Sequence, residues 1–399
     1  MKIKSIYVDN FKSLVDFKID LVDFNCLVGL NGSGKSTFLQ FVDFLTQLMR
    51  GNIQHWLNKY KINSLQLPFF KDNKEQEIKF RIDFTENFAA NEIEYWAGIY
   101  NVAYSRCTSE TVQMGDTVFT VDNNPNQKSK KYSIQKLQQE SFNQNINFDY
   151  QGSIFSQLAD TNLSELKEFN NFKQTIKSLQ IFGLLTPFFL KQNTKDSNGS
   201  IGYEGGNLSA FLYDMKEDQR EAITKKLKTV YPNFGFFKSS VLNDQTKTLT
   251  IGELYRNGNS TYQTSLRNIN DGLLRITAFL AEIESKHQIL FFDEIENGIN
   301  IEVIEFLLDQ LTGCGKQIIV TTHSPLFLNF LDDEVARKAV QYFYKTPEGF
   351  TQSIPFFSIP RINKKLDVLG PGEAFADTDL AGLVEEIMTA NNKESEQCI

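Results

Sequence analysis

The chain of 399 residues has few cysteines and histidines and no long hydrophobic run. Its four cysteines are scattered without C-x-x-C spacing, so the sequence indicates neither a disulfide framework nor a zinc site, and we expect a reducing compartment. No window approaches the roughly 18 uninterrupted apolar residues of a transmembrane helix. The start of the chain alternates like a strand and does not resemble a signal peptide. We therefore expect a cytoplasmic protein without a membrane span.

The sequence also lacks an excess of positive charge. Lys and Arg number 41 against 49 Asp and Glu, which gives a net charge of −8. Nucleic acid could then bind only at a local patch of Lys and Arg. Three short basic clusters, at residues 128–131, 225–228 and 361–365, could form such a patch, but a solvated surface explains each of them better. Nucleic acid is thus possible as a partner and is not indicated.

One stretch of the chain fits a complete phosphate-binding pattern, because residues 29–36 read G-x-x-x-x-G-K-[ST]. The apolar run at 24–28 predicts a buried strand before it, and apolar residues recur at helical spacing from 38 to 48 after it. In the order strand, glycine-rich turn and helix, backbone N–H groups point at a phosphate. The alternative is a chance glycine-rich turn, which would lack this strand and helix on its two sides. We therefore predict a nucleoside triphosphate site. Its loop residues are Asn31, Gly32, Ser33, Gly34, Lys35, Ser36 and Thr37.

The chemistry of this loop assigns roles to three of its side chains. Lys35 is expected to meet the β- and γ-phosphates, and Ser36 is expected to offer its hydroxyl to Mg²⁺ with support from Thr37. These assignments make ATP with Mg²⁺ the predicted cofactor.

A second apolar run, at 288–292, ends in Asp293 and Glu294. A buried parallel strand that delivers an Asp to its carboxyl end is the usual way to hold Mg²⁺. We interpret Asp293 as the acid on the metal side, acting through water, and Glu294 as the general base for the attacking water. The alternative is a strand followed by an acidic helix cap, and the phosphate loop makes it the weaker interpretation.

A further buried strand is predicted at 317–321, and it leads into His323. Ligands collect just past the carboxyl ends of strands in open α/β sheets. A neutral imidazole there can hydrogen-bond the γ-phosphate or the attacking water, so we favour a sensor role over a structural one.

The polar turn Asn270-Asp271-Gly272 precedes an apolar helix. Such a turn presents backbone N–H groups and a positive helix end to an anion. Because the phosphate loop already occupies one side of a nucleotide, this turn would serve a nucleotide held by another copy of the protein. A plain N-capped helix is the alternative, and the position of the turn between the loop and the acidic strand favours the anion site.

This order of segments resembles the ABC-type ATPase head: phosphate loop, long insertion, signature turn, acidic strand, switch histidine. More narrowly, it resembles the SMC-like, single-chain "AAA ATPase" proteins of prokaryotic anti-phage and genome-maintenance systems, as in Septu-, retron- or PARIS-like systems. The stretches that carry this resemblance are residues 9–14, 205–212, 293–299 and 321–325.

The resemblance implies an α/β fold, an ABC-type P-loop ATPase head split by an antiparallel β-subdomain and a helical insertion. Alternating patterns at 76–84, 99–105 and 117–122 are typical of the β part, and 123–150, rich in Asn, Gln, Lys and Ser, is expected to be a loop or linker. We expect an N-terminal part of the head at 1–84, a β-rich insertion and linker at 85–150, a helical insertion at 151–247 and a C-terminal part of the head at 248–399.

The resemblance also adds site residues. It places Lys12 and Ser13 among the nucleotide-binding residues and offers Gln66 as the glutamine that senses the metal. The chain departs from the family at two places. Asn270 stands where the signature usually has Ser, and Asn300-Ile301 stands where His-Pro is common.

The function implied is ATP hydrolysis by a head-to-head homodimer, with higher oligomers left open, that regulates a partner effector encoded nearby. The effector would be a nuclease or toxin, and the setting would be anti-phage defence. Too few residues follow His323 for a TOPRIM nuclease domain, so no nuclease activity is expected in this chain. The alternative is a DNA-binding ATPase of recombination or repair. An ABC transporter subunit is disfavoured because such subunits lack a long insertion before the signature.

Overall fold

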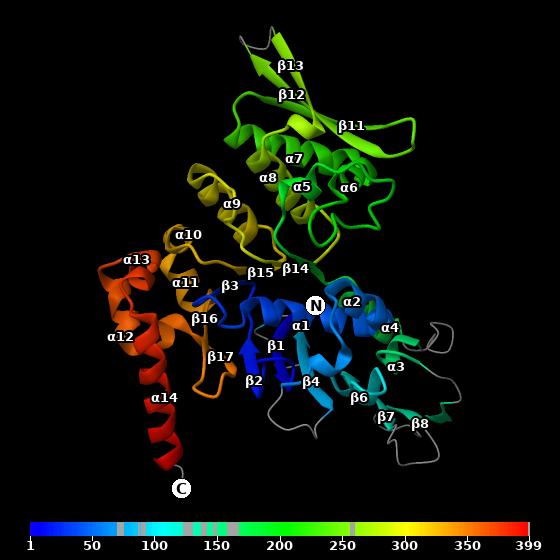
Figure 1. The fold of residues 1–399 in the computed structure, drawn as a ribbon, viewed down its shortest axis with the longest axis vertical. Coiled ribbons are helices and arrows are strands. Elements are labelled where there is room, and N and C mark those ends of the chain that lie inside the picture. The colour runs from blue at the N-terminus through cyan, green and yellow to red at the C-terminus, as the bar shows by residue number, and fades with distance from the viewer. Residues whose placement is uncertain are drawn as a thin grey trace. The chain divides into compact units, whose positions relative to one another are not determined.

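The computed structural model describes residues 1–69, 76–86, 88, 93–122, 131–136, 142–146, 150–157, 167–255 and 260–397. The chain forms two compact units, each built from separate stretches (Figure 1). Unit 1 comprises Met1–Leu179, Arg337–Asp367 and Ala376–Ile399. Unit 2 comprises Gln180–Ala336 and Val368–Phe375. No helix among the described residues is both long and apolar enough to cross a membrane.

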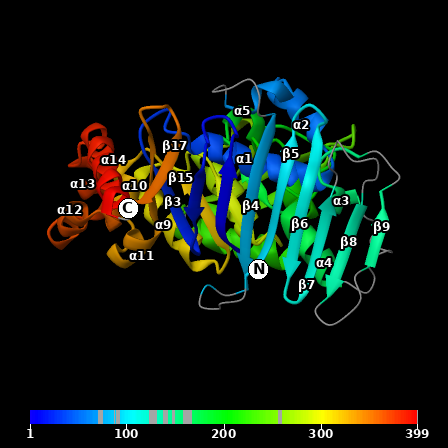
Figure 2. The ribbon, with the colours of Figure 1, turned by 90° about the horizontal axis from the view of Figure 1, so that it is seen from below.

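Unit 1 contains an eight-stranded antiparallel sheet in the order β2-β1-β4-β5-β6-β7-β8-β9 (Figure 2). Strand β4 shows why it forms: Ile78, Phe80, Ile82 and Phe84 alternate with more exposed residues, so one face of the strand is apolar. The strands are β1 (Lys2–Asp9), β2 (Phe17–Asp20), β4 (Glu77–Thr85), β5 (Glu94–Asn101), β6 (Arg106–Met114), β7 (Thr117–Asp122), β8 (Lys131–Lys136) and β9 (Phe142–Asn145).

The predicted strands at 76–84 and 117–122 are present as β4 and β7. The stretch predicted as a strand at 99–105 is instead the end of β5 followed by a turn at 102–105. We predicted residues 123–150 as a loop or linker, but two of its segments are the strands β8 and β9. They form strands because β8 pairs with β7 and β9 pairs with β8 at the edge of the sheet. The remaining parts of that stretch, 123–130, 137–141 and 147–149, lie outside the described residues.

Helix α1 (Lys35–Arg50) lies in the aromatic core of unit 1. Phe38 packs 5.8 Å, centroid to centroid, from Phe17 of β2, and Phe44 packs 5.1 Å from Tyr100 of β5. Phe11 lies 5.1 Å from Phe41, so three successive turns of the helix contact aromatic rings. This packing uses the high phenylalanine content of the chain to fix the helix that follows the phosphate loop.

Three further strands of unit 1 flank the phosphate loop. Strand β3 (Phe24–Val28) is fully buried and pairs in parallel with β16 (Val340–Lys345), which pairs antiparallel with β17 (Thr351–Pro355). The other elements of this unit are α2 (Ile53–Tyr60), η1 (Ser64–Gln66), α3 (Ile154–Gln157), α4 (Lys167–Lys177), η4 (Phe356–Ser358), α12 (Pro360–Asn363), η5 (Lys364–Asp367) and α14 (Leu380–Gln397).

Unit 2 is built around three parallel strands, with β14 (Ile289–Phe292) between β10 (Gln180–Phe182) and β15 (Gln317–Thr321). Every residue of β14 and β15 is buried, as expected for parallel strands covered on both faces. Strand β10 lies in a stretch that we predicted as helical, since three residues are too few to show a strand period. The helices that lie wholly or partly in this unit include α5 (Pro187–Leu190), α8 (Asp271–Ile283), α9 (Ile301–Gly313), α10 (Pro325–Asn329), α11 (Asp333–Ala339) and α13 (Pro371–Ala376).

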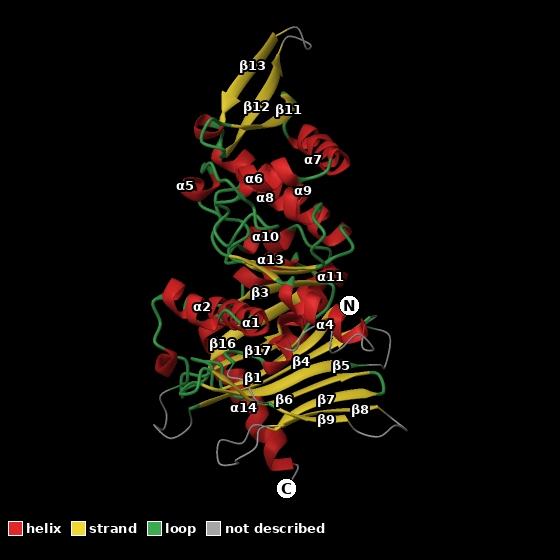
Figure 3. Ribbon diagram, turned by 90° about the vertical axis from the view of Figure 1, so that its right-hand side faces the viewer, coloured by secondary structure: helices red, strands yellow, loops and turns green. Residues whose placement is uncertain are grey.

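A small antiparallel sheet completes unit 2, in the order β11-β12-β13 (Figure 3). Helices α6 (Leu208–Asp214) and α7 (Glu217–Val230) contact its strands. Its strands are β11 (Phe234–Val241), β12 (Lys247–Tyr255) and β13 (Ser260–Ser265).

Candidate functional site

The phosphate loop in unit 1 joins the end of β3 to the start of α1. Gly29, Gly32 and Gly34 have φ values of 147°, 78° and 110°, which glycine adopts without strain. Two of them also permit close approach. A Cβ atom would lie 2.2 Å from the carbonyl oxygen of Phe343 at Gly29, and 2.1 Å from Oγ1 of Thr351 at Gly34. The loop can therefore lie this close to β16 and β17 only with glycine at both positions.

Lys35 begins α1, and its side chain folds back over the loop. Its Nζ donates to the carbonyl oxygens of Gly29 at 2.9 Å and Leu30 at 3.2 Å, and the residue is only 5% exposed. These contacts hold an ammonium group at the centre of the loop. The neighbouring predicted residues differ in exposure: Ser33 is buried, Gly34 and Thr37 are half-buried, and Asn31, Gly32 and Ser36 are exposed.

The start of α1 fits a triphosphate. Amide groups in the first turn of a helix have no acceptor within the helix, and here the N-cap Gly34 supplies no side-chain cap and the first turn contains no acid. Its partial positive charge is therefore available to an anion. The exposed Ser36 hydroxyl has the oxygen chemistry that Mg²⁺ prefers.

Lys12 and Ser13 lie in the turn between β1 and β2, where Phe11 and Leu14 form an isolated bridge. Lys12 Nζ donates to Oε1 of Gln40 on α1 at 2.5 Å, and burial lowers the pKa of Lys12. Ser13 Oγ lies 2.9 Å from Oγ1 of Thr351. Both predicted residues thus contact elements that hold the phosphate loop.

Gln66 is exposed, and its Oε1 accepts the backbone N–H of Asn63 at 2.9 Å, which caps the short helix η1. Its side chain is therefore engaged in a local cap. Its role as a metal sensor stays a prediction.

In unit 2, Asp293 and Glu294 follow β14 directly, and Thr321 ends the neighbouring strand β15. Thr321 Oγ1 donates to Oδ1 of Asp293 at 2.6 Å and accepts the backbone N–H of Glu294 at 2.8 Å. One hydroxyl thus orders both acids. Glu294 has a φ of 49°, a left-handed conformation that costs a non-glycine residue on the order of 1 kcal/mol or more. Such strain persists where surrounding contacts enforce it, and it often marks functional sites.

His323 is exposed, and its backbone N–H donates to Oε1 of Glu296 at 2.8 Å. The other carboxylate oxygen of Glu296 is buried without a hydrogen-bond partner among the described residues. Glu296 therefore links the acidic loop, residues 293–299 after β14, to the segment that carries the predicted switch histidine. The sequence signal for Glu296 was its place in the 293–299 stretch, but no pattern pointed to its contact with His323.

The signature turn lies in the same unit as the acids. The Asn270 side chain accepts the backbone N–H of Leu273 at 3.2 Å and so caps α8, and Oδ1 of Asp271 lies 2.6 Å from Nζ of Lys191. A Cβ atom on Gly272 would lie 3.5 Å from the carbonyl oxygen of Gly298 in the acidic loop. The structure therefore brings the turn at 270–272 next to the loop that follows Asp293 and Glu294.

Comparison with known proteins identifies the family. A family model described as "AAA domain, putative AbiEii toxin, Type IV TA system" matches residues 24–329. The chain belongs to this AAA-domain family. No curated protein sequence matches it.

The chain of this AAA-domain protein is also similar to solved structures. An SMC head bound to the C-terminal winged-helix domain of ScpA has a TM-score of 0.52 and 12% identity, over 89% of this chain and 98% of that chain. The SMC head domain from Thermotoga maritima has a TM-score of 0.47 and 12% identity, over 89% and 99% of the two chains. At this identity the first similarity shows the fold alone. The predicted ABC-type head fold is confirmed, and family and fold together support a P-loop ATPase.

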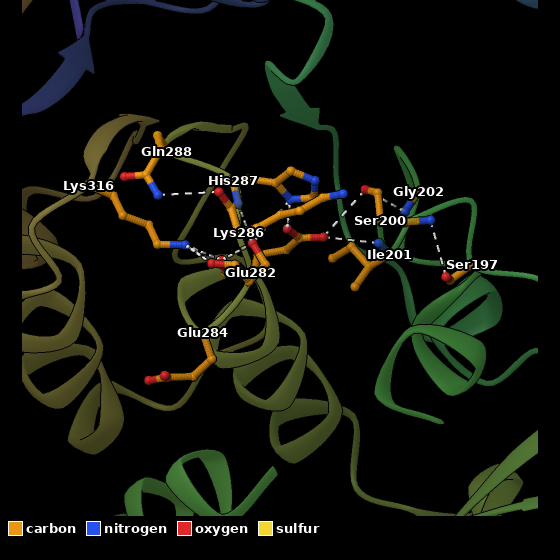
Figure 4. A network of polar contacts seen from close by, with 12 residues as sticks. Ser197, Ser200, Ile201, Gly202, Glu282, Glu284, Lys286, His287, Gln288 and Lys316 are labelled. Carbon is orange, nitrogen blue, oxygen red and sulfur yellow. Dashed lines mark hydrogen bonds and ion pairs between the residues drawn. The ribbon is translucent and has the colours of Figure 1, made fainter. Parts of the chain in front are cut away.

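The far end of α8 in this AAA-domain protein carries a second polar network (Figure 4). Glu282 is fully buried and accepts the backbone N–H of Ile201 at 3.0 Å, and its other oxygen lies 2.8 Å from Nδ1 of His287. Lys316 Nζ donates to the carbonyl oxygens of Glu282 at 3.1 Å and Ser285 at 2.6 Å. The network connects the C-terminal end of α8, the helix that follows the signature turn, to the glycine-rich turn at 199–206 and to Lys316 just before β15. The sequence assigned no role to His287, and the structure shows that its ring contacts the buried Glu282 carboxylate.

Proposed function

We propose that this AAA-domain protein binds and hydrolyses ATP with Mg²⁺ and uses the cycle as a conformational switch. The observation that carries the proposal is the phosphate loop, where the Lys35 ammonium is held over the carbonyl oxygens of Gly29 and Leu30 at a helix start without acids. Membership of the AAA-domain family and the SMC-head fold support it.

Each predicted residue has one task in this proposal. Lys35 and the loop N–H groups bind the phosphates, and Ser36 offers an oxygen to the metal. Asp293 holds the metal side through water, and Glu294 takes the proton of the attacking water. Mg²⁺, when bound, neutralises charge that develops on the phosphate oxygens.

Two contacts in unit 2 suit this division of labour. The Thr321 hydroxyl fixes Asp293 by its carboxylate and Glu294 by its backbone, which leaves the Glu294 carboxylate available for the proton. Nδ2 of Asn297 donates a hydrogen bond to Oε2 of this carboxylate at 3.2 Å. His323 is exposed and would contact the γ-phosphate or the attacking water.

The proposal extends to a second copy of the chain. The turn Asn270-Asp271-Gly272 would contact the nucleotide held by the partner copy, so that ATP joins two heads face to face and hydrolysis lets them part. The exposed start of α8 supports this assignment, since Asn270 and Asp271 are both exposed there. Higher oligomers are compatible with it.

The switch would act on a partner effector, a nuclease or toxin encoded nearby, in cytoplasmic anti-phage defence. The family description names a putative toxin of a type IV toxin–antitoxin system, which links the family to systems that contain a toxin.

The proposal is tested with Lys35→Ala. Loss of a buried ammonium that contacts the phosphates should weaken ATP binding about 10- to 100-fold, the effect of a charge-assisted contact. Isothermal titration with ATP and Mg²⁺ measures the change, and Lys338→Ala, at an exposed lysine, is the matched control. Unchanged affinity in Lys35→Ala would show that the nucleotide site is elsewhere.

A further inference from the structure

Thr351 begins β17 and lies against the phosphate loop, 318 positions away in sequence from the loop residue that it contacts. It is fully buried. Its Oγ1 donates to the carbonyl oxygen of Ser33 at 2.9 Å, accepts Nζ of Lys345 at 2.9 Å and lies 2.9 Å from Oγ of Ser13. A hydroxyl has one proton and two acceptor sites. Because the proton goes to Ser33, the Ser13 hydroxyl must be the donor in its contact, and the Thr351 hydroxyl is then fully used.

The contact with Ser33 fixes the direction of the next amide group. In a trans peptide the C=O of one residue and the N–H of the following residue point to opposite sides, and the described chain contains no cis peptide. Holding the Ser33 carbonyl toward Thr351 therefore turns the Gly34 N–H away from β17. Gly34 has a φ of 110° and no side chain to hold it, so the peptide depends on such an anchor.

The anchor is close and charge-assisted. A Cβ atom on Gly34 would lie 2.1 Å from Oγ1 of Thr351, so nothing larger than glycine fits beside the hydroxyl. Lys345 is half-buried and donates to the carbonyl oxygen of Gly349 at 3.1 Å as well as to Thr351. A donor with a positive charge polarises the hydroxyl and strengthens the hydrogen bond that it makes to Ser33.

We propose that Thr351 is a positioning residue for the nucleotide, which holds the Ser33–Gly34 peptide so that the Gly34 amide faces the triphosphate. This inference rests on the proposed ATP binding at the loop. Loops that cradle phosphates bind them with successive backbone N–H groups, so a peptide that rotates removes one donor from the ligand. Thr351 itself touches no nucleotide in this account.

The test compares three variants by titration with ATP and Mg²⁺. Thr351→Val keeps the shape and removes the hydroxyl, and it should weaken ATP binding about tenfold, the effect of one lost backbone contact. Thr351→Ser keeps the hydroxyl and should restore affinity to within about threefold of wild type, which a merely structural effect of shape would not do. Ser353→Ala is the matched control, because the Ser353 hydroxyl on the same strand donates to the carbonyl oxygen of Lys18 at 3.2 Å, outside the loop.

The outcomes separate this inference from the function on which it rests. A wild-type protein that binds no ATP contradicts the proposed function. Wild-type affinity in Thr351→Val, with ATP binding intact, overturns the role of Thr351 alone. Should Thr351→Val not fold, Thr351→Ala decides by the same affinity: about tenfold weaker binding supports the inference, and unchanged binding overturns it.

Discussion

At the scale of single residues, two threonine hydroxyls organise the site residues of the two units. Thr321 orders Asp293 and Glu294, and Thr351 anchors the phosphate loop. The sequence predicted the charged residues because they stand at fixed spacings within short motifs. It could not predict Thr351, whose contact with Ser33 joins distant parts of the chain and leaves no local pattern.

Replacing Glu294 tests whether this residue, rather than Asp293, is the general base. Glu294→Gln keeps the size of the side chain and removes its ability to accept a proton. We expect the ATP hydrolysis rate, measured as phosphate release, to fall about 10²- to 10⁴-fold while ATP affinity is kept. Glu302→Gln, at an exposed residue of α9, should hydrolyse at the wild-type rate. A wild-type rate in Glu294→Gln would remove Glu294 from the mechanism.

Glu110 makes stability depend on pH. Its carboxylate in β6 is fully buried, and this burial raises its pKa to about 7 although Ser153, Ile154 and Trp96 donate hydrogen bonds to it. The folded protein therefore keeps a proton that the unfolded chain releases near its ordinary pKa of 4.5, so stability falls as pH rises from about 4.5 to 7. The expected loss is on the order of 3 kcal/mol.

Urea unfolding of wild type and Glu110→Gln at several pH values between 4.5 and 8 measures this effect. The altered hydrogen bond lowers the free energy of unfolding of the variant by the same amount at every pH. The two proteins are therefore compared by how steeply the free energy of unfolding changes with pH. Parallel slopes for the two proteins would mean that Glu110 ionises normally in the fold.

At the scale of elements, short apolar runs of about five residues and apolar residues at helical spacing were the reliable signals. The runs at 24–28 and 288–292 are the buried strands β3 and β14, and the helical spacing from 38 to 48 lies on α1. Strands β10 and β13, which the sequence missed, lack such a run. Strand β10 has three residues, and β13 reads Ser-Thr-Tyr-Gln-Thr-Ser, so each depends on pairing with a neighbour that the sequence does not reveal.

The packing of the acidic loop on the signature helix can be tested at Gly298. It has a φ of 66°, and a Cβ atom would lie 1.1 Å from Nη1 of Arg275, whose Nε donates to the carbonyl oxygen of Leu185 at 2.7 Å. Gly298→Ala should therefore cost both backbone strain, about 1 kcal/mol, and overpacking of about 1–3 kcal/mol.

Gly315→Ala is the matched control, because Gly315 has a φ of 72° with nothing within 4 Å of its Cβ position. Denaturant unfolding should show the backbone cost alone in this variant. Equal losses in the two variants would indicate that Arg275 moves aside without penalty.

At the scale of the whole molecule, the order of motifs predicted an ATPase head divided by long insertions, and the ABC-type head fold is confirmed. The sequence did not predict that the N-terminal strands β1 and β2 belong to the same eight-stranded sheet as β4 to β9. Sheet membership depends on long-range backbone pairing, which local patterns do not encode. Pairing of two copies depends on complementary surfaces and remains our proposal.

Mixing two inactive variants tests the central claim, that the signature turn of one copy completes the nucleotide site of another. Lys35→Ala disables the loop and Gly272→Arg fills the turn, so each variant alone should show little ATP hydrolysis at an ATP concentration near the wild-type affinity. An equal mixture should regain about a quarter of wild-type ATP hydrolysis, because half of the dimers are mixed and each of these has one intact site. A mixture as inactive as its components would contradict the claim.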